Sequence, residues 1–193
     1  LKGDYDNAIN LLKNALEADP ASRDAHQQLA KLYHTLGMTD DELALYKDWI
    51  EQRPKDAAPY YQQAKLLESM GRDAEALESL RTFQQTTKGE LGSYPVSASL
   101  YRQLGMHAEE RATLQAWTSA TPNSIDAHRA LAQSYARGNE RVAALAEYQW
   151  VAQAAPASAD AHTDLGNAYQ RLRQYENAQA EYAVAMNLQP DNM

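Results

Sequence analysis

Residues 159–192 read ADAHTDLGNAYQRLRQYENAQAEYAVAMNLQPDN, with apolar residues recurring at the period of an α-helix. The stretch predicts two amphipathic helices that are joined by a short turn and closed by a proline. Proline also stands 34 residues earlier at Pro156, again at Pro122, and with the same spacing at Pro54 and Pro20. A residue type that recurs at one fixed period indicates a stacked repeat array.

The period divides the chain into a half repeat and five complete repeats, which we predict to form a single all-α array of about eleven helices. Its predicted boundaries are 1–22 for the half repeat and 23–56, 57–90, 91–124, 125–158 and 159–192 for the full repeats. Gly37, Gly71 and Gly105 are expected to end first helices, because glycine adopts the left-handed conformation found there. The loosest junction is TTKGELGS, residues 86–93, which has two glycines and no proline.

Two polar residues are placed to cap helices in this scheme. Asp56 precedes the first helix of the 57–90 repeat, and Ser93 precedes that of the 91–124 repeat. Their side-chain oxygens can accept hydrogen bonds from the free N–H groups of the first turn. We therefore expect Asp56 and Ser93 to be N-caps.

Composition limits the classes of function. The chain has 193 residues, no cysteine and a net charge of −8, from 26 acidic and 18 basic residues. The acidic balance argues against a general nucleic-acid binder, which needs a basic face, and no apolar run is long enough to span a bilayer. Because the chain starts without Met in mid-repeat, we expect it to be a fragment. The bacterial periplasm and the cytoplasm are both compatible with the sequence.

The repeated residues resemble the tetratricopeptide repeat (TPR). The last repeat carries that pattern as His162, Leu165-Gly166, Tyr169, Ala178, Tyr182, Ala185 and Pro190. The fourth repeat carries it as His128, Leu131-Ala132, Tyr135, Ala144, Tyr148 and Pro156. The resemblance covers the whole chain. It implies a right-handed superhelix of antiparallel helix pairs, with a concave groove lined by the first helix of each pair.

Two kinds of position concern packing between helices. A small residue stands where each first helix must approach its second helix closely, at Ala30, Ala64, Ala98, Ala132 and Gly166. The sequence departs from the family pattern where Glu42 and Glu110 replace a small residue of the second helix, and where Trp49, Phe83 and Trp117 replace alanine. Either the bulky residues change the local superhelical pitch, or the core repacks around them.

The sequence offers little for catalysis or metal binding. His26, His128 and His162 occupy the same slot of different repeats, and Tyr60 and Tyr94 fill that slot in the other two. A slot that accepts either His or Tyr is a packing position, and equivalent residues of stacked repeats lie too far apart to share a metal ion. No phosphate-binding loop, nucleophile elbow or Cys–His pair is visible. We therefore expect a non-enzymatic protein without cofactor or metal.

The family pattern also implies which residues line the groove. The candidate contacts are Lys31, His34, Tyr61, Lys65, Arg102, Arg129, Gln133, Arg137, Asn167 and Arg171. Six of the ten are Lys or Arg, so the groove favours an extended or helical partner segment that is partly acidic. The lysine and asparagine pair with which some TPR proteins clamp a peptide carboxylate does not recur here. A merely solvated polar face is the alternative interpretation of these residues.

The sequence thus predicts a scaffold that binds a peptide segment or partner domain in its groove. Charge reversal at Arg129, Arg137 and Arg171 is expected to weaken binding without unfolding the protein. The alternative is a structural segment of a larger assembly, either self-associating through its repeat ends or serving as the TPR part of a bacterial envelope or polysaccharide-export machine.

Overall fold

The structure, a computed structural model, describes residues 2–189 and consists there of eleven α-helices without a strand. Leu1, Pro190 and the end of the last predicted repeat lie outside the described residues. The predicted all-α class and the number of helices are confirmed. The helices are α1 (Lys2–Ala18), α2 (Arg23–Leu36), α3 (Thr39–Gln52), α4 (Ala57–Ser69), α5 (Asp73–Thr86), α6 (Ser93–Gln103), α7 (His107–Ala120), α8 (Ile125–Arg137), α9 (Arg141–Ala154), α10 (Ala159–Arg171) and α11 (Tyr175–Leu188).

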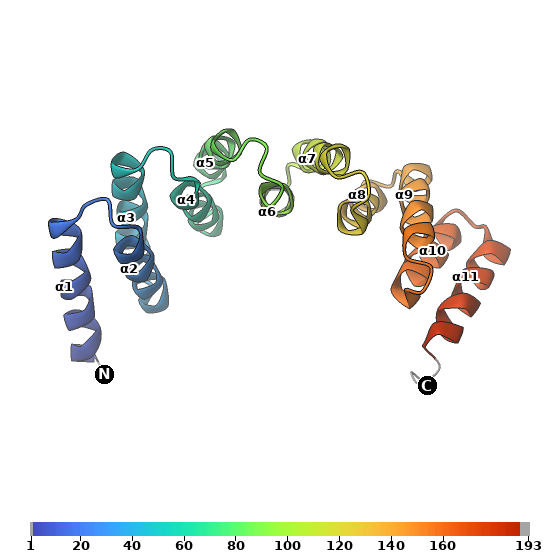
Figure 1. Ribbon diagram of the computed structural model, residues 1–193, viewed down its shortest axis with the longest axis horizontal. Helices are drawn as coiled ribbons and strands as arrows, with labels where there is room; N and C mark the ends of the chain where they lie inside the picture. Colours follow the sequence, from blue (N-terminus) through green and yellow to red (C-terminus); the bar gives the residue numbers. More distant parts are fainter. Residues whose placement is uncertain (1, 190–193) are drawn as a thin grey trace. The chain divides into compact units, whose positions relative to one another are not determined.

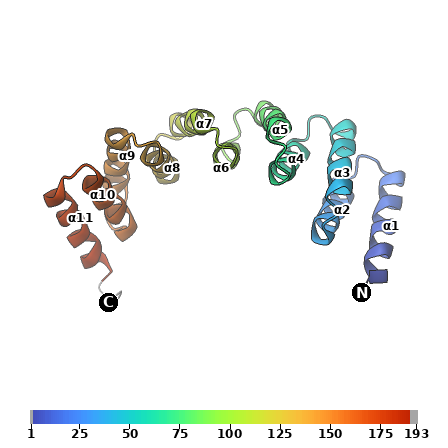
Figure 2. The same ribbon diagram turned by 180° about the vertical axis from the view of Figure 1, so that it is seen from behind.

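The chain divides into two compact units, residues 1–90 and 91–193. The first unit holds α1 to α5 and the second holds α6 to α11, and within each unit every helix packs against the next one along the chain (Figure 1). Figure 2 shows the same succession from behind. The division falls within residues 86–93, the junction that the sequence marks as loosest.

The fifteenth position of each full repeat has a left-handed backbone. It is glycine in the first three repeats, where Gly37, Gly71 and Gly105 have φ of 68°, 71° and 70°. The last two repeats place Asn139 and Arg173 there, each with φ of 60°. The turn after each first helix therefore has one geometry throughout. Only the first three repeats use the residue that adopts it without strain.

The predicted N-caps have different outcomes. The Asp56 carboxylate accepts from the Ala58 N–H at 3.1 Å and therefore caps α4 as expected. The prediction for Ser93 is wrong: the N-cap residue of α6 is Gly92, and Ser93 is already the first helical residue. Gly92 has an αR backbone, so the helical conformation begins before the serine can occupy the capping position.

Asp56 also joins two consecutive repeats. The Arg23 guanidinium, from the start of α2, donates to both carboxylate oxygens at 2.9 and 2.6 Å. Burial raises the pKa of Asp56, but hydrogen bonds from Arg23 and the Ala58 N–H and the charges of Arg23 and Arg53 outweigh it, so the pKa is lowered. The carboxylate therefore stabilises the folded state at neutral pH and loses that contribution in acid, below its usual range of titration.

The shared histidine and tyrosine slot is a junction between repeats, in agreement with its assignment as a packing position. His128 Nε2 lies 3.0 Å from the carbonyl oxygen of Pro122, and His162 Nε2 lies 3.1 Å from that of Pro156. The Tyr60 hydroxyl donates to the carbonyl oxygen of Pro54 at 3.1 Å. Each side chain thus binds the last turn of the preceding repeat, which explains why either residue type serves.

The helix crossings use small residues as expected. All five crossing residues are buried, and Gly166 has the tightest environment. A Cβ atom at Gly166 would lie 2.5 Å from Cε1 of Tyr182, closer than non-bonded carbon atoms approach. Trp49, one of the bulky departures, is 1% exposed and stacks on His26 with 5.2 Å between ring centroids. Trp49 thus lies in the core as one member of an aromatic pair.

The left-handed turn gives a direct stability prediction. Replacing Arg173 by Gly removes the Cβ that disfavours the left-handed conformation, which costs about 1 kcal/mol in a non-glycine residue. We expect R173G to raise the free energy of unfolding by about 0.5–1 kcal/mol in urea denaturation. The control is R173A, which removes the charge but keeps the Cβ. A similar gain in R173A would show that charge, and not backbone strain, determines the effect.

Candidate functional site

The ten candidate groove residues lie on the first helices of the repeats, as the family pattern implies. Four belong to the first unit, with Lys31 and His34 on α2 and Tyr61 and Lys65 on α4. The other six belong to the second unit and come from α6, α8 and α10. They are Arg102, Arg129, Gln133, Arg137, Asn167 and Arg171.

In the first unit the candidates form two small clusters. The Lys65 ammonium lies 5.7 Å from the centre of the Tyr61 ring, which in turn packs against Phe83 with 5.4 Å between centroids. Burial raises the pKa of the Tyr61 hydroxyl. On α2, His34 Nδ1 lies 3.2 Å from the buried Glu42 carboxylate, whose other oxygen accepts from Tyr46 at 2.8 Å. Glu42, a departure from the family pattern, is thus held by two side chains.

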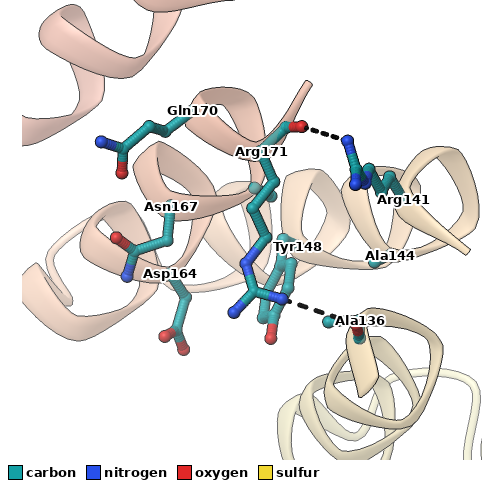
Figure 3. Close-up of a pocket in the computed structure, with 9 residues that line it drawn as sticks. Ala136, Arg141, Ala144, Tyr148, Asp164, Asn167, Gln170 and Arg171 are labelled. Atoms are coloured by element: carbon teal, nitrogen blue, oxygen red, sulfur yellow. Dashed lines mark hydrogen bonds between the residues drawn. The ribbon is translucent and has the colours of Figure 1, made fainter. Parts of the chain in front are cut away.

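Two hollows of the second unit contain candidate residues. The larger one, about 380 Å³, lies between α8, α9 and α10 and contains Asn167 and Arg171 (Figure 3). Its other polar residues are Arg141, Tyr148, Asp164 and Gln170. The smaller hollow, about 140 Å³, is lined by Arg102, Gln133 and Arg137 among others. The structure therefore divides five of the six candidates between two neighbouring depressions.

Tyr182 orients the amides at one side of the larger hollow. Its hydroxyl lies 2.8 Å from Oδ1 of Asn167 and 3.2 Å from Oε1 of Gln170, and donates toward both oxygens. The NH₂ group of Asn167 has no acceptor among the described residues. Gly166 has no side chain, so the Tyr182 ring can approach α10 closely. This glycine therefore helps to fix the direction of the Asn167 amide.

Two candidate arginines form ion pairs between repeats. Arg137, at the end of α8, hydrogen-bonds Oε1 of Glu110 on α7, a carboxylate whose side chain is 3% exposed. Arg129 Nε lies 3.7 Å from Oδ2 of Asp164 on α10. Charge reversal at Arg137 would bring a second carboxylate against buried Glu110, so it is expected to destabilise the unit. The expectation that such a change leaves folding intact therefore needs revision for Arg137.

Arg171 is different, because no carboxylate lies within ion-pair distance of it in the described protein. Its Nη1 donates to the Ala136 carbonyl oxygen at 3.5 Å, while its own carbonyl oxygen accepts from Arg141 at 3.0 Å (Figure 3). Arg102 likewise contacts only an uncharged group, the Ser99 hydroxyl at 3.3 Å. The guanidinium of Arg171 is thus an uncompensated cation at the wall of the larger hollow.

The hollow also perturbs two titratable groups. Burial raises the pKa of the Asp164 carboxyl; the charge of Arg129 opposes that rise, and Asp160 adds to it. Burial raises the pKa of the Tyr148 hydroxyl as well, with Asp164 adding to the rise and Arg171, Arg137 and Arg129 opposing it. No hydrogen-bond partner of the Tyr148 hydroxyl lies among the described residues. A carboxyl whose ionised form is disfavoured, beside a buried hydroxyl without a protein partner, is an arrangement found at ligand-binding sites.

Sequence reasoning missed Asp164, Tyr148 and Arg141. Tyr148 entered the sequence analysis only as a residue of the repeat pattern, and the other two lie outside the groove positions of the family pattern. A weak signal for Asp164 was available, since a carboxylate directly before the buried Leu165-Gly166 pair must lie close to the core. Arg141 enters because the start of α9 reaches the end of α10.

Comparison with known families agrees with the repeat geometry. One tetratricopeptide repeat model matches residues 1–66 and another matches residues 159–192. The chain belongs to the tetratricopeptide repeat family. Between the two matches, the structure keeps the same left-handed residue at the fifteenth position of each repeat. No curated protein matches the sequence.

Solved TPR structures share the fold. YrrB, described as a TPR protein with an unusual peptide-binding site, is 19% identical with a TM-score of 0.67, covering 94% of each chain. A MamA protein is 19% identical with a TM-score of 0.68, over 86% of this chain and 90% of its own. MamA from Desulfovibrio magneticus RS-1 is 17% identical with a TM-score of 0.69, over 90% and 97%. Similarity at this level of identity establishes the fold alone.

The chemistry available in the hollow is recognition through hydrogen bonds and charge. Arg171, Tyr148 and Asn167 can donate, and Asp164 can accept. Within residues 2–189, no three His, Asp or Glu side chains lie close enough to hold a metal ion. Over the same residues, no helix combines the length and apolarity that crossing a bilayer requires.

Asp164 provides a test of this electrostatic picture. Its raised pKa means that the ionised carboxyl lowers the free energy of unfolding above its usual titration range, and that this penalty vanishes in acid, where the carboxyl is protonated in both states. We expect D164N to stabilise the protein at pH 7 by up to about 1 kcal/mol, a few degrees in Tm, and to have no effect near pH 3.

The matched control is D126N, on α8. Asp126 is exposed in the first helical turn, where a negative charge favours the helix, so its removal should not stabilise. Thermal denaturation by circular dichroism at both pH values measures the two variants. Destabilisation by D164N at pH 7 would contradict the conclusion that the folded protein disfavours the ionised Asp164 carboxyl.

Proposed function

We propose that this TPR array is a non-enzymatic interaction scaffold, and that the hollow between α8, α9 and α10 binds an acidic segment of a partner protein. Repeat arrays of this family typically serve as scaffolds, and the related YrrB is described as having a peptide-binding site. The observation that carries the proposal is the uncompensated Arg171 guanidinium beside the unpartnered donors of Asn167 and Tyr148.

These groups suit the carboxylate of a partner's Asp or Glu. Arg171 can bind a carboxylate through two parallel N–H groups, and the Asn167 amide or the Tyr148 hydroxyl can supply a further hydrogen bond. The Asp164 carboxylate can accept a hydrogen bond from a main-chain N–H of the same segment. That bond stabilises the ionised form of Asp164. The polar face is in this view a binding surface, in preference to a merely solvated one, because the Asn167 amide and the Tyr148 hydroxyl donate to no acceptor in the described part of the chain.

The test begins with selection of peptides from a random library displayed on phage, and measures the fluorescence anisotropy of a labelled selected peptide. We expect the selected peptides to be enriched in Asp and Glu. R171E should weaken binding by about tenfold or more, because it replaces attraction by repulsion at the carboxylate.

R173E is the matched control, since it makes the same charge change two residues away. Arg173 is exposed, does not line the hollow and has no side-chain interaction among the described residues. Equal losses in R171E and R173E would reduce the effect to net charge. Unchanged affinity in R171E would contradict the proposal.

A second candidate function is assembly, which the exposed end of the second unit favours. Tyr175 and Met186 on α11 are 63% and 66% exposed and line an apolar hollow of about 330 Å³. The preceding second helices, α7 and α9, are each covered by the next first helix. Self-association through this face predicts a molecular mass in light scattering that rises with concentration and that M186E lowers. A constant monomer mass would exclude it.

A further inference from the structure

The first unit contains a hollow on the side of α4 that lies away from the groove candidates. About 370 Å³ in volume, it lies between α3, α4 and α5, and Gln63 and Leu67 of α4 line it. These residues are two positions away from the groove candidates Tyr61 and Lys65. At about 100° per residue, two positions place them roughly on the opposite side of the helix. The hollow is therefore separate from the groove face of α4.

The floor of this hollow is apolar. Leu43 and Leu67 are buried, and Ile50 and Tyr60 line it as partly buried residues. A floor of this kind favours the aliphatic part of a side chain, whether Leu or the methylene stem of Lys or Arg. The volume holds one or two such side chains.

One buried polar group points into the hollow without a complete set of partners. Gln63 is only 9% exposed, and its Oε1 accepts a hydrogen bond from the Ser79 hydroxyl at 2.8 Å. That bond fixes the amide so that the NH₂ group is directed away from Ser79. No acceptor for this NH₂ group lies within the part of the chain that the structure describes. A ligand that supplies an acceptor there, such as a main-chain carbonyl oxygen, gains a hydrogen bond to a donor whose direction is already fixed.

The rim carries negative charge that the protein does not neutralise. Glu75 forms a bidentate pair with Arg72 at 2.7 Å and is also near the positive charge of Lys47. Glu51 on α3 and Glu78 on α5 are exposed and have no ion-pair partner among the described residues. Glu51 and Glu78 line the hollow from two consecutive second helices, α3 and α5, and their two negative charges outnumber the single positive charge of Lys47.

We propose that this hollow is a second docking site, which binds a basic segment of a partner protein. A Lys or Arg side chain lays its stem on Leu43 and Leu67 and its charged head between Glu51 and Glu78. A main-chain carbonyl of the same segment accepts from Gln63. The site selects the charge opposite to that proposed for the groove of the second unit, and does not depend on that proposal.

The test uses two defined peptides and the ¹⁵N-labelled full chain. Acetyl-Leu-Lys-Ala-Leu-Arg-amide is the basic probe, and acetyl-Leu-Glu-Ala-Leu-Glu-amide is its acidic counterpart. We expect the basic peptide alone to shift the amide resonances around Leu43, Gln63 and Ser79. E51Q/E78Q should lower its affinity by about fivefold or more, because both rim carboxylates lose their charge.

The matched control is D6N/E17Q, which removes two exposed acidic charges from α1 in the same unit. This variant should keep the wild-type affinity within about twofold. Equal losses in both double variants would show attraction to the net charge only. Shifts with the acidic peptide at the same residues, or an affinity that E51Q/E78Q leaves unchanged, would overturn the proposal.

Discussion

The structure depends on one backbone constraint, the left-handed residue at the fifteenth position of every full repeat. It reverses the chain after each first helix, so that the second helix returns along it and meets a small residue at the crossing. Gly37, Gly71 and Gly105 adopt this conformation freely. Asn139 adopts it at little cost because asparagine tolerates the left-handed region, whereas Arg173 adopts it under strain. The turn is thus kept even where the sequence no longer supplies glycine, and the packing of successive pairs enforces it.

The same regularity explains where binding groups arise. Repeats are joined by polar contacts at fixed positions, such as Arg23 with Asp56 and Arg137 with Glu110. When an arginine of one repeat has no carboxylate at the equivalent position of the preceding repeat, it forms no such ion pair. Ala144 occupies the place of Glu110 one repeat later, and Arg171 is therefore left facing the hollow. A binding cation results from a missing partner in an otherwise repeated pair.

The period alone was sufficient to predict the helices, the turns and the shared His/Tyr slot, because each depends on local spacing. It could not predict that Arg137 pairs with buried Glu110, since that contact depends on how one helix pair rotates against the next. Asp164 and Tyr148 were missed for the same reason: their surroundings come from three helices. Ser93 failed as a cap because α6 begins in the irregular junction, where the period gives no guidance.

The larger hollow of the second unit, formed by α8, α9 and α10, is proposed to receive a partner segment. Hydrogen exchange followed by mass spectrometry, with and without a peptide selected on the protein, tests it most directly. We expect slower exchange concentrated in α8 and α10, around Ala136 and Arg171, and no such slowing in R171E. Protection confined to α7 or α11, or spread evenly over the chain, would contradict it.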